Sequence, residues 1–287
     1  MGGGLSPQSS YLSTELMCRF VAYLGQATTL ERVISAPEHS LVVQSYRPGE
    51  MTSGVVNADG FGVGWYNRAL DPTPCVYTNL SPIWSDRNLP GLSRHIASQC
   101  IFANVRSATP GLAVDQSNCQ PFAYQQFLFM HNGYIENFRF TLMRQLREAL
   151  RDEYYTAIGG STDSEHIFAL LLNFLHGQPV TLPTLVAALR ETIGQLLHWA
   201  SGTGTALALN LAVTNGEYVV VSRFANPAPA PSLYYANNTA FFPQAAVIAS
   251  ERLFVSPDWS TVPDGSLVAG EAGLDLQLYH LRYERAA

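Results

Sequence analysis

The apolar residues of this chain fall into many short runs, and the order of these runs limits the folds open to it. Strand-like runs lie toward both ends of the sequence, at 20–24, 61–66, 101–105, 127–130, 207–214, 218–224, 246–249 and 274–281. Segments with helical spacing or helix-end signals lie between them, at 140–151, 161–175 and 184–199. Because strands flank the helices instead of alternating with them, the pattern predicts an α+β fold with helices packed against stacked sheets.

Length and composition favour one folded domain. The chain has 287 residues, of which 47% are hydrophobic and 13% charged, and no repeat or linker divides it. The formal net charge is −6 and the Lys and Arg residues are scattered, so we expect no nucleic acid partner. Apolar runs such as 168–172 are far shorter than the roughly 20 residues of a membrane-spanning helix, and the N-terminus lacks a signal-peptide pattern. We therefore expect a cytoplasmic protein with no membrane partner.

The cysteines and histidines form no recognisable metal motif. Cys18, Cys75, Cys100 and Cys119 include no C-x-x-C pair, and we interpret the last three as small buried hydrophobic residues. The seven histidines show no H-x-x-x-H or H-E-x-x-H spacing, so we expect no metal and no cofactor. The glycines at alternate positions of 60–64 lack the spacing of a dinucleotide fingerprint and are expected to allow close packing in a strand.

Four short polar motifs stand out, because each begins or follows a predicted strand or opens a predicted helix. They are Met17-Cys18-Arg19-Phe20, Arg106-Ser107-Ala108-Thr109, His131-Asn132-Gly133 and Ser161-Thr162-Asp163-Ser164-Glu165. Each alone has a structural explanation: a cysteine in a first strand is usually core, Asn-Gly usually forms a turn, and Asp often caps a helix. Their joint occurrence in this order points to a functional site.

Together these motifs resemble the class II glutamine amidotransferases, over about Met17 to Leu281. They are most similar to the stand-alone branch that includes the ergothioneine-pathway amidohydrolase and the amidotransferase-like subunit of the fungal glutathione-degradation complex. Further matching segments are Gln44-Ser45-Tyr46, Asn57-Ala58-Asp59-Gly60-Phe61-Gly62, Gln120-Pro121-Phe122, Val221-Ser222-Arg223 and Ala249-Ser250-Glu251. The resemblance implies a four-layer αββα sandwich, the N-terminal-nucleophile (Ntn) hydrolase fold, in one domain over 18–287.

The resemblance also implies a reaction, the hydrolysis of a γ-glutamyl amide bond by Cys18. If Cys18 is the first residue, its α-amine, with a reference pKa of about 7.7–8.0, can accept the proton of the thiol, whose reference value is about 8.5. The family's donors to the resulting oxyanion correspond to the Asn132 side chain and the Gly133 N–H. We interpret His131 as a structural residue. Hydrolysis of the thioester on Cys18 would then release glutamate.

A γ-glutamyl group carries an α-carboxylate and an α-ammonium, and the resemblance gives each a partner. Arg106 corresponds to the residue that binds the carboxylate, assisted by Thr109, and its guanidinium suits bidentate binding. Asp163 corresponds to the residue that binds the ammonium. The helix dipole favours an ionised Asp at a helix start, although capping alone would also explain this residue.

The sequence departs from the family at two points. Pro110 stands where many glutamine-using relatives carry His, which argues against an ordinary glutaminase. Residues 1–17 precede Cys18 and would block its amine. The first sixteen are rich in Gly and Ser without apolar periodicity, so we expect 1–17 to be a flexible extension or a misplaced start, absent from the active form. Either translation starts at Met17, which is then removed, or the extension is cleaved.

The first hypothesis is hydrolysis of γ-glutamyl-hercynylcysteine S-oxide to glutamate and hercynylcysteine S-oxide in ergothioneine biosynthesis, because no residues remain for a synthetase domain. The alternatives are γ-glutamyl cleavage of glutathione or a related peptide with a partner subunit, an ammonia-supplying glutaminase, and a non-catalytic γ-glutamyl-binding module. We expect the leaving group to contact loops at 44–51, 78–87 and 225–243. A homo-oligomer and a partner peptidase both stay open.

Overall fold

The computed structural model describes residues 18–50, 56–107, 115–227, 229–273 and 275–283. The expected extension at 1–17 therefore lies outside the described residues, as do Thr109 and Pro110. Within the described part, the strands form two seven-stranded sheets, and every strand pair is antiparallel.

Sheet A contains β1 (Arg19–Thr29), β2 (Phe61–Asn67), β3 (Asp71–Asn79), β4 (Ala97–Val105), β10 (Tyr234–Asn237), β11 (Ala245–Ala249) and β12 (Ser260–Thr261). Sheet B contains β5 (Phe122–Tyr124), β6 (Phe127–Ile135), β7 (Leu207–Thr214), β8 (Tyr218–Arg223), β9 (Ala225–Asn226), β13 (Ser266–Glu271) and β14 (Gln277–His280). The strand orders are β12-β10-β11-β1-β4-β2-β3 and β14-β13-β8-β7-β6-β5, with β9 paired to β7.

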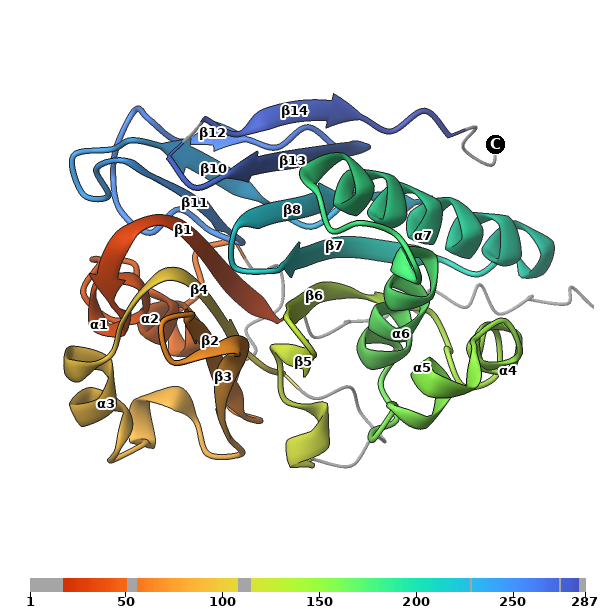
Figure 1. Cartoon of the computed structure of the whole chain (residues 1–287), viewed down its shortest axis with the longest axis horizontal. Coiled ribbons are helices and arrows are strands. Elements are labelled where there is room, and N and C mark those ends of the chain that lie inside the picture. The colour runs from red at the N-terminus through yellow and green to blue at the C-terminus, as the bar shows by residue number, and fades with distance from the viewer. Residues whose placement is uncertain (1–17, 51–55, 108–114, 228, 274, 284–287) are drawn as a thin grey trace, which may run out of the picture.

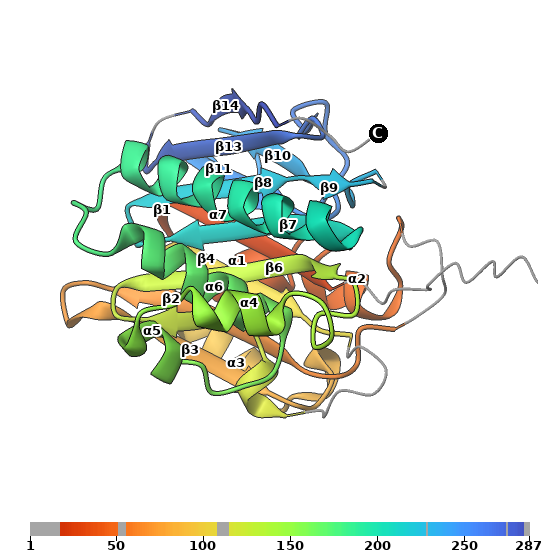
Figure 2. The same cartoon turned by 90° about the vertical axis from the view of Figure 1, so that its right-hand side faces the viewer.

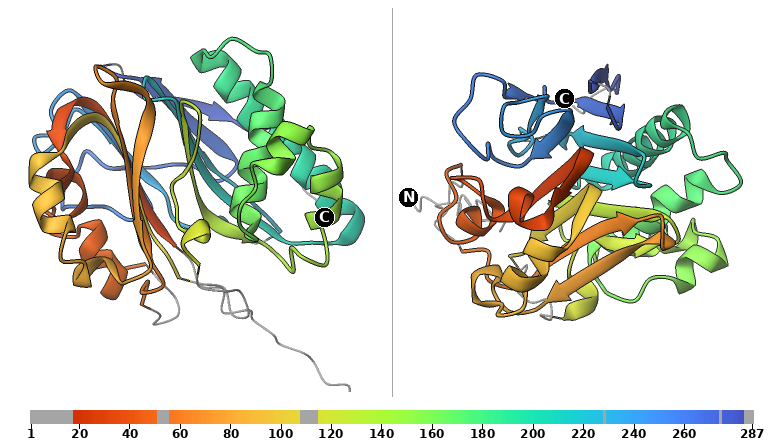
Figure 3. Two further views of the ribbon diagram at one scale, coloured as in Figure 1. Left: turned by 60° about the horizontal axis from the view of Figure 1, so that its bottom comes forward. Right: turned by 60° about the vertical axis from the view of Figure 1, so that its left-hand side comes forward.

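Helices cover the outer faces of the two stacked sheets (Figures 1 and 2). They are α1 (Leu30–Ile34), α2 (Leu41–Tyr46), α3 (Leu89–His95), α4 (Met143–Glu148), α5 (Asp152–Thr156), α6 (Asp163–Leu175) and α7 (Leu182–Thr203), with short 3-10 turns at Ile83–Ser85 and Gln116–Asn118. The first three pack on sheet A, and α6 and α7 pack on sheet B (Figure 3, left). This arrangement is an αββα sandwich, so the expected α+β fold is confirmed.

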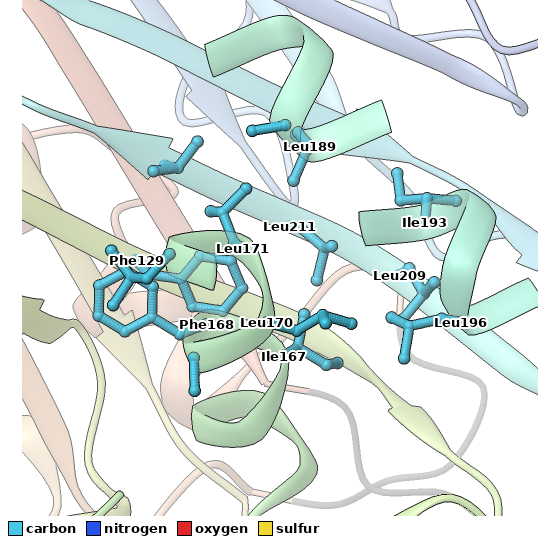
Figure 4. Packing of buried hydrophobic residues seen from close by; sticks show 14 of the residues in the cluster. Phe129, Ile167, Phe168, Leu170, Leu171, Leu189, Ile193, Leu196, Leu209 and Leu211 are labelled. Carbon is cyan, nitrogen blue, oxygen red and sulfur yellow. The ribbon is translucent and has the colours of Figure 1, made fainter. Parts of the chain in front are cut away.

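Three hydrophobic layers hold the sandwich together. Between the sheets, Phe20 of β1 belongs to the same cluster as Leu128 and Met130 of β6. Between sheet B and its helices, Phe129 stacks on Phe168 of α6 with ring centroids 5.1 Å apart, in a cluster rich in leucines (Figure 4). A third cluster joins sheet A to α1, α2 and α3. Alternate residues of β6 thus face different cores, as the pleat of a strand requires.

Some predicted elements have different limits in the structure. The sequence predicts a strand that ends before Gly25, whereas β1 continues to Thr29. A β-carbon at Gly25 would overlap Ala245 of β11, so this glycine lets two paired strands approach closely. Asn132-Gly133, a turn sequence by composition, lies inside β6. The predicted helix at 140–151 is wrong in extent: it contains α4, and α5 follows as a separate helix.

Candidate active site

Cys18 directly precedes β1, an inner strand of sheet A. Arg19 pairs with Val105 of β4, so Cys18 lies beside Arg106 at the end of the same ladder. On the side of β4 that faces β2, the N–H of Arg106 donates to the carbonyl of Gly60 at 2.8 Å. Cys18, Arg106 and Gly60 therefore form a row across the ends of three adjacent strands.

The side chains of this row face the gap between the sheets. Phe20 packs into the inter-sheet core, and Cys18 lies two residues earlier in the same extended segment, so both point to the same side. A β-carbon at Gly62 of β2 would overlap the backbone carbonyl of Gln120. The expectation that glycines at alternate positions permit close packing is therefore confirmed, because Gly62 lets the segment before β5 lie directly against sheet A.

Asn132 approaches the same gap from β6 of sheet B. It lies on the inter-sheet face, because Met130, two residues earlier, belongs to the core between the sheets. Its side-chain nitrogen donates to Ser250 Oγ at 3.4 Å, and the same hydroxyl accepts the N–H of Phe20 at 3.0 Å. One hydroxyl therefore joins Asn132 to the segment that carries Cys18.

The edge of β6 that faces away from β7 presents three successive N–H groups. The first, from His131, donates to the side-chain oxygen of Gln120 at 2.6 Å. The third, from Ile135, donates to Asp163 Oδ2 at 2.8 Å. Strand alternation directs the N–H of Gly133 to the same edge, between the other two. The N–H of Gly133 is thus a backbone donor that lies between the side chains of Gln120 and Asp163.

The residues around this donor are fixed by local geometry. Gly133 has a φ of +154°, and a β-carbon there would overlap the carbonyl oxygen of Ala208. His131 donates from Nε2 to the same carbonyl at 2.9 Å, and its Nδ1 lies 3.0 Å from Ser164 Oγ. Burial lowers the pKa of His131, which favours the neutral ring. Because both ring nitrogens are engaged, the geometry agrees with a structural role for His131.

Asp163 is the first residue of α6, and its carboxylate joins this helix to β6. Thr162 is the N-cap, since its hydroxyl accepts the N–H of Glu165. Asp163 Oδ1 accepts the N–H of Ser164 at 2.7 Å, while Oδ2 binds Ile135. The hydroxyl of Ser164 also lies 3.2 Å from Oδ1. A carboxylate has about four acceptor positions, so these three contacts still leave capacity for a cationic group.

Charges from both sides of the gap act on the Cys18 thiol. Burial raises its pKa, while a hydrogen bond from the Ser107 backbone and the positive charge of Arg106 oppose the rise. Asp163 raises this pKa further and Arg19 lowers it, with a net increase. The thiol is therefore protonated near neutral pH and needs a base before it can act as a nucleophile.

Several buried polar atoms at this end of the gap have no hydrogen-bond partner in the part of the chain that the structure describes. Within the described ranges, no hydrogen bond is made by Nη1 of Arg106, Oγ of Ser107, Oδ1 of Asn132 or either amide atom of Asn104. Asn104 pairs with Phe20 across the β1–β4 ladder and faces the gap with it. Buried polar groups are nearly always hydrogen-bonded, so this cluster indicates room for a polar ligand or ordered water.

The structure brings five of the expected site residues to one end of the gap, and only Thr109 falls outside the described residues. Asn104, Ser250 and Glu251 also belong to this region, although no role was predicted for them from the sequence. Their contacts join segments far apart in the chain: Arg19 and Glu251 are separated by 232 positions. Only the resemblance of the Ala-Ser-Glu motif could have marked the last two.

The other sequence expectations have mixed outcomes. Cys100 and Cys119 are buried as expected, but Cys75 is exposed because it lies on β3 at the edge of sheet A. In the part of the chain that the structure describes, no three His, Cys, Asp or Glu side chains are grouped so that they could hold a metal ion. The same part has no helix with the length and apolar character needed to cross a membrane.

Comparison with known proteins identifies the family. The profile of the class II glutamine amidotransferases matches residues 37–285. The chain belongs to this family. Its relatives are named as hydrolases and as a glutamine amidotransferase, and this class II glutamine amidotransferase is an amidohydrolase.

The alignments with two relatives cover most of this class II amidotransferase. The probable glutamine amidotransferase DUG3 of Saccharomyces cerevisiae is 33% identical, over 88% of this chain and 81% of its own. The γ-glutamyl-hercynylcysteine sulfoxide hydrolase of Mycolicibacterium smegmatis is 29% identical, over 88% of this chain and 95% of its own.

Solved structures confirm the Ntn-type fold. A glutamine aminotransferase class-II domain protein from Silicibacter pomeroyi has a TM-score of 0.67 and 28% identity, and the match covers 92% of this chain and 99% of that one. The glutamine phosphoribosylpyrophosphate amidotransferase of B. subtilis has a TM-score of 0.59 and 15% identity, over 93% of this chain and 50% of its own. At that identity the likeness concerns the fold alone.

Proposed function

We propose that this protein hydrolyses the amide bond of a γ-glutamyl compound, with Cys18 as the nucleophile. The observation that carries the proposal is the meeting of the expected nucleophile, carboxylate partner and oxyanion donors at one end of the inter-sheet gap. Buried polar atoms without a partner among the described residues lie at the same place. A polar substrate would satisfy them, which an apolar packing role does not explain.

The two charged groups on the α-carbon of the γ-glutamyl group are bound by two side chains of opposite charge. Arg106 binds the α-carboxylate, and its Nη1, which makes no hydrogen bond to a described residue, is available for this. Asp163 binds the α-ammonium with the acceptor capacity that its two backbone hydrogen bonds leave. Both charges act on the Cys18 thiol, so both lie within electrostatic reach of it. Thr109 is assigned to the carboxylate on the resemblance alone.

The base is the α-amine of Cys18, which is free once residues 1–17 are removed. The nearby imidazoles are engaged: His131 contacts Ala208 and Ser164, and His39 Nε2 lies 2.7 Å from a Glu251 oxygen. An amine on the same residue as the thiol avoids the need for a separate histidine.

The reaction then proceeds through a thioester. The amine takes the thiol proton, and the sulfur attacks the γ-carbonyl carbon. Asn132 Nδ2 and the Gly133 N–H bind the oxyanion. When the tetrahedral intermediate collapses, the C–N bond breaks and the leaving amine takes the proton from the α-ammonium of Cys18. Water attacks the thioester, which releases glutamate and restores the thiol.

We propose γ-glutamyl-hercynylcysteine S-oxide as the substrate. The support is that three relatives, 28–29% identical over 88% of the chain, are named hydrolases of this compound. The second candidate is the amide of glutamine, because the fungal relative named a probable glutamine amidotransferase is 33% identical. Cleavage of glutathione with a partner subunit stays an alternative on the sequence resemblance alone. Pro110, where many glutamine-using relatives carry His, argues against glutamine itself.

The three segments expected to contact the leaving group meet in the structure. Tyr46 and Trp84, both about half exposed, form an edge-to-face pair with ring centroids 5.7 Å apart. The hydroxyl of Tyr234 donates to a Glu50 carboxylate oxygen at 2.9 Å. Segment 44–51 therefore touches both of the others, and Trp84 is our candidate contact to the leaving group.

A substrate panel tests this assignment. Protein that begins at Cys18 is assayed for glutamate release from γ-glutamyl-hercynylcysteine S-oxide, glutathione and glutamine, beside Cys18→Ala and Trp84→Ala. We expect the highest kcat/KM for the first substrate, no release by Cys18→Ala, and an altered preference in Trp84→Ala. A preference for glutathione or glutamine would replace the substrate assignment, and Cys18-independent release would refute the nucleophile. Binding of γ-glutamyl ligands without release would favour the non-catalytic alternative.

A further inference from the structure

Two adjacent residues just after β11, Ser250 and Glu251, contact both halves of the proposed active site. β11 pairs directly with β1, and the chain leaves β11 at the end where Cys18 lies. Ser250 also donates its backbone N–H to the Phe20 carbonyl at 3.0 Å, which continues the ladder. The next side chains along this segment are therefore held beside the nucleophile.

Glu251 is a fully buried carboxylate with several donors. Its Oε1 lies 2.7 Å from Arg19 Nε, and its Oε2 lies 2.7 Å from both His39 Nε2 and the N–H of Gly49. Although burial alone would raise its pKa, the hydrogen bonds from His39 and Arg19 and the charge of Arg19 lower it to about 2. The carboxylate is thus ionised at any pH at which the enzyme would work.

Arg19 connects Glu251 to Cys18 through two hydrogen bonds. Its Nη1 donates to the Cys18 carbonyl at 3.0 Å while its Nε is fixed by Glu251. The plane of that carbonyl sets the backbone torsion of Cys18, and therefore the directions in which its α-amine and thiol project. Without the carboxylate, the buried Arg19 would lose the partner of its Nε, and the direction of its Nη1 toward the Cys18 carbonyl would be less constrained.

Ser250 contacts Asn132, the side chain that is proposed to bind the oxyanion. Its hydroxyl accepts the Phe20 N–H at 3.0 Å and the Asn132 side-chain nitrogen at 3.4 Å. The second contact sets which end of the Asn132 amide faces Ser250, and so orients the N–H groups that are proposed to bind the oxyanion. The distance between the nucleophile segment and the oxyanion donor therefore depends on one hydroxyl.

We propose that Ser250 and Glu251 are positioning residues that align the Cys18 thiol and amine with the Asn132 amide. Neither touches the substrate: Glu251 acts through Arg19 and Ser250 acts through Phe20 and Asn132. The proposal rests on the γ-glutamyl hydrolase function proposed above. It predicts that loss of either group affects the chemical step and not substrate binding, because the hydrogen bonds of these two residues within the described part of the chain do not include Arg106 or Asp163.

Ser250→Ala is the first test, with Ser98→Ala as its matched control. Ser98 is also a buried serine of sheet A whose hydroxyl accepts a backbone N–H from a neighbouring strand, that of Tyr66 at 3.2 Å. It pairs with Thr28 near the other end of β1, far from Cys18. We expect kcat to fall by about 10- to 100-fold in Ser250→Ala, with KM within about threefold, since small misalignment costs this much. Ser98→Ala should keep kcat, and Ser250→Thr, which restores a hydroxyl, should recover part of it.

A second measurement does not depend on turnover. Alkylation of Cys18 is followed by mass spectrometry with a chloroketone analogue of glutamine and with iodoacetamide, which requires no oriented carbonyl. In Ser250→Ala and in Glu251→Gln, the ratio of the chloroketone rate to the iodoacetamide rate should fall about tenfold or more. A ratio and a kcat equal to those of wild type, in variants that remain folded by circular dichroism, would overturn the proposal.

Failure of the proposed function has a different signature. In that case the wild-type protein itself releases no glutamate from any γ-glutamyl substrate and shows no preference for the chloroketone. This outcome would overturn the proposed function and the positioning role with it. Active wild-type protein with unaffected Ser250 and Glu251 variants would overturn the positioning role alone.

Discussion

The proposed active site depends on side chains that strand register brings to one end of the inter-sheet gap from distant parts of the chain. Cys18, Arg106 and Asn132 follow from short motifs that resemble a family, and the structure places them in one region. Asn104 carries no such signal: only strand register shows that it faces the inter-sheet gap, where its two amide atoms have no hydrogen-bond partner among the described residues. Ser250 belongs to a segment that resembles the family, but its positioning role follows only from its contacts with Phe20 and Asn132, which are far away in sequence.

Gly133 gives a sharp residue-scale prediction. We expect Gly133→Ala to reduce activity by at least about 10²-fold, because the β-carbon would overlap the Ala208 carbonyl and displace the proposed oxyanion donor. Gly204→Ala is the control: Gly204 also has a positive φ, +67°, but no atom within 4 Å of an added β-carbon. It should lose about 1 kcal/mol of stability and keep its activity. Full activity of soluble Gly133→Ala would contradict the assignment.

Asn104 gives a prediction about stability. Because neither of its amide atoms has a partner among the described residues, Asn104→Leu should change the free energy of unfolding by less than about 1 kcal/mol. Asn210→Leu is the comparison, since its Nδ2 donates to the carbonyls of Pro231 and Ser232 at 3.1 and 3.2 Å. That variant should lose about 1–3 kcal/mol in urea unfolding. Equal losses in the two variants would show that Asn104 does have a structural partner.

At the scale of elements, the sequence indicates long periodic segments well and short ones poorly. The helices at α6 and α7 and the hairpin of β7 and β8 follow from apolar spacing, helix caps and the Asn215-Gly216 turn. The predicted loop at 225–243 is wrong in part, since it contains β9 and β10. Helices such as α1, with five residues, are too short to show a helical period. Asn132-Gly133 lies in a strand because pairing with β7 overrides the local turn preference.

The start of α6 should make the protein sensitive to acid. Buried His166 accepts from Arg147 Nε at 2.9 Å and donates from Nδ1 to the Thr162 carbonyl at 2.7 Å, so it must be neutral. Burial, with the charge of Arg147, lowers its pKa from 6.5 to about 4. The folded state requires the neutral ring of His166, whereas the unfolded chain can bind a proton there below about pH 6.5. The contribution of His166 to the free energy of unfolding is therefore complete above about pH 6.5 and is lost as the pH falls toward 4. The loss is about 3 kcal/mol.

Urea unfolding at pH 7.5 and pH 4.5 checks this prediction. Wild type should lose more stability between the two than His166→Gln, in which that titration is absent. His198→Gln, which removes an exposed histidine, should behave like wild type. An identical loss in His166→Gln and wild type would rule out His166 as a source of the acid sensitivity.

At the scale of the whole molecule, the α+β class follows from the distribution of apolar runs, while the order of strands does not. Strand β1 lies between β11 and β4, so partners at opposite ends of the chain enclose the nucleophile segment. Local patterning contains no information on such pairings, and the αββα arrangement was expected only from the resemblance. The same non-local pairing builds the site, because sheet A supplies Cys18 and Arg106 while sheet B supplies Asn132 and Gly133.

The proposed reaction requires that the α-amine of Cys18 act as the base for its own thiol. The most direct test compares glutamate release by protein that begins at Cys18 with release by protein that retains residues 1–17, each confirmed by intact mass. We predict that the first is active, that its kcat/KM rises with pH through the pKa of an α-amine, about 7.7–8.0, and that the second is inactive. If the form that retains residues 1–17 is as active as the form that begins at Cys18, the α-amine of Cys18 is not the base.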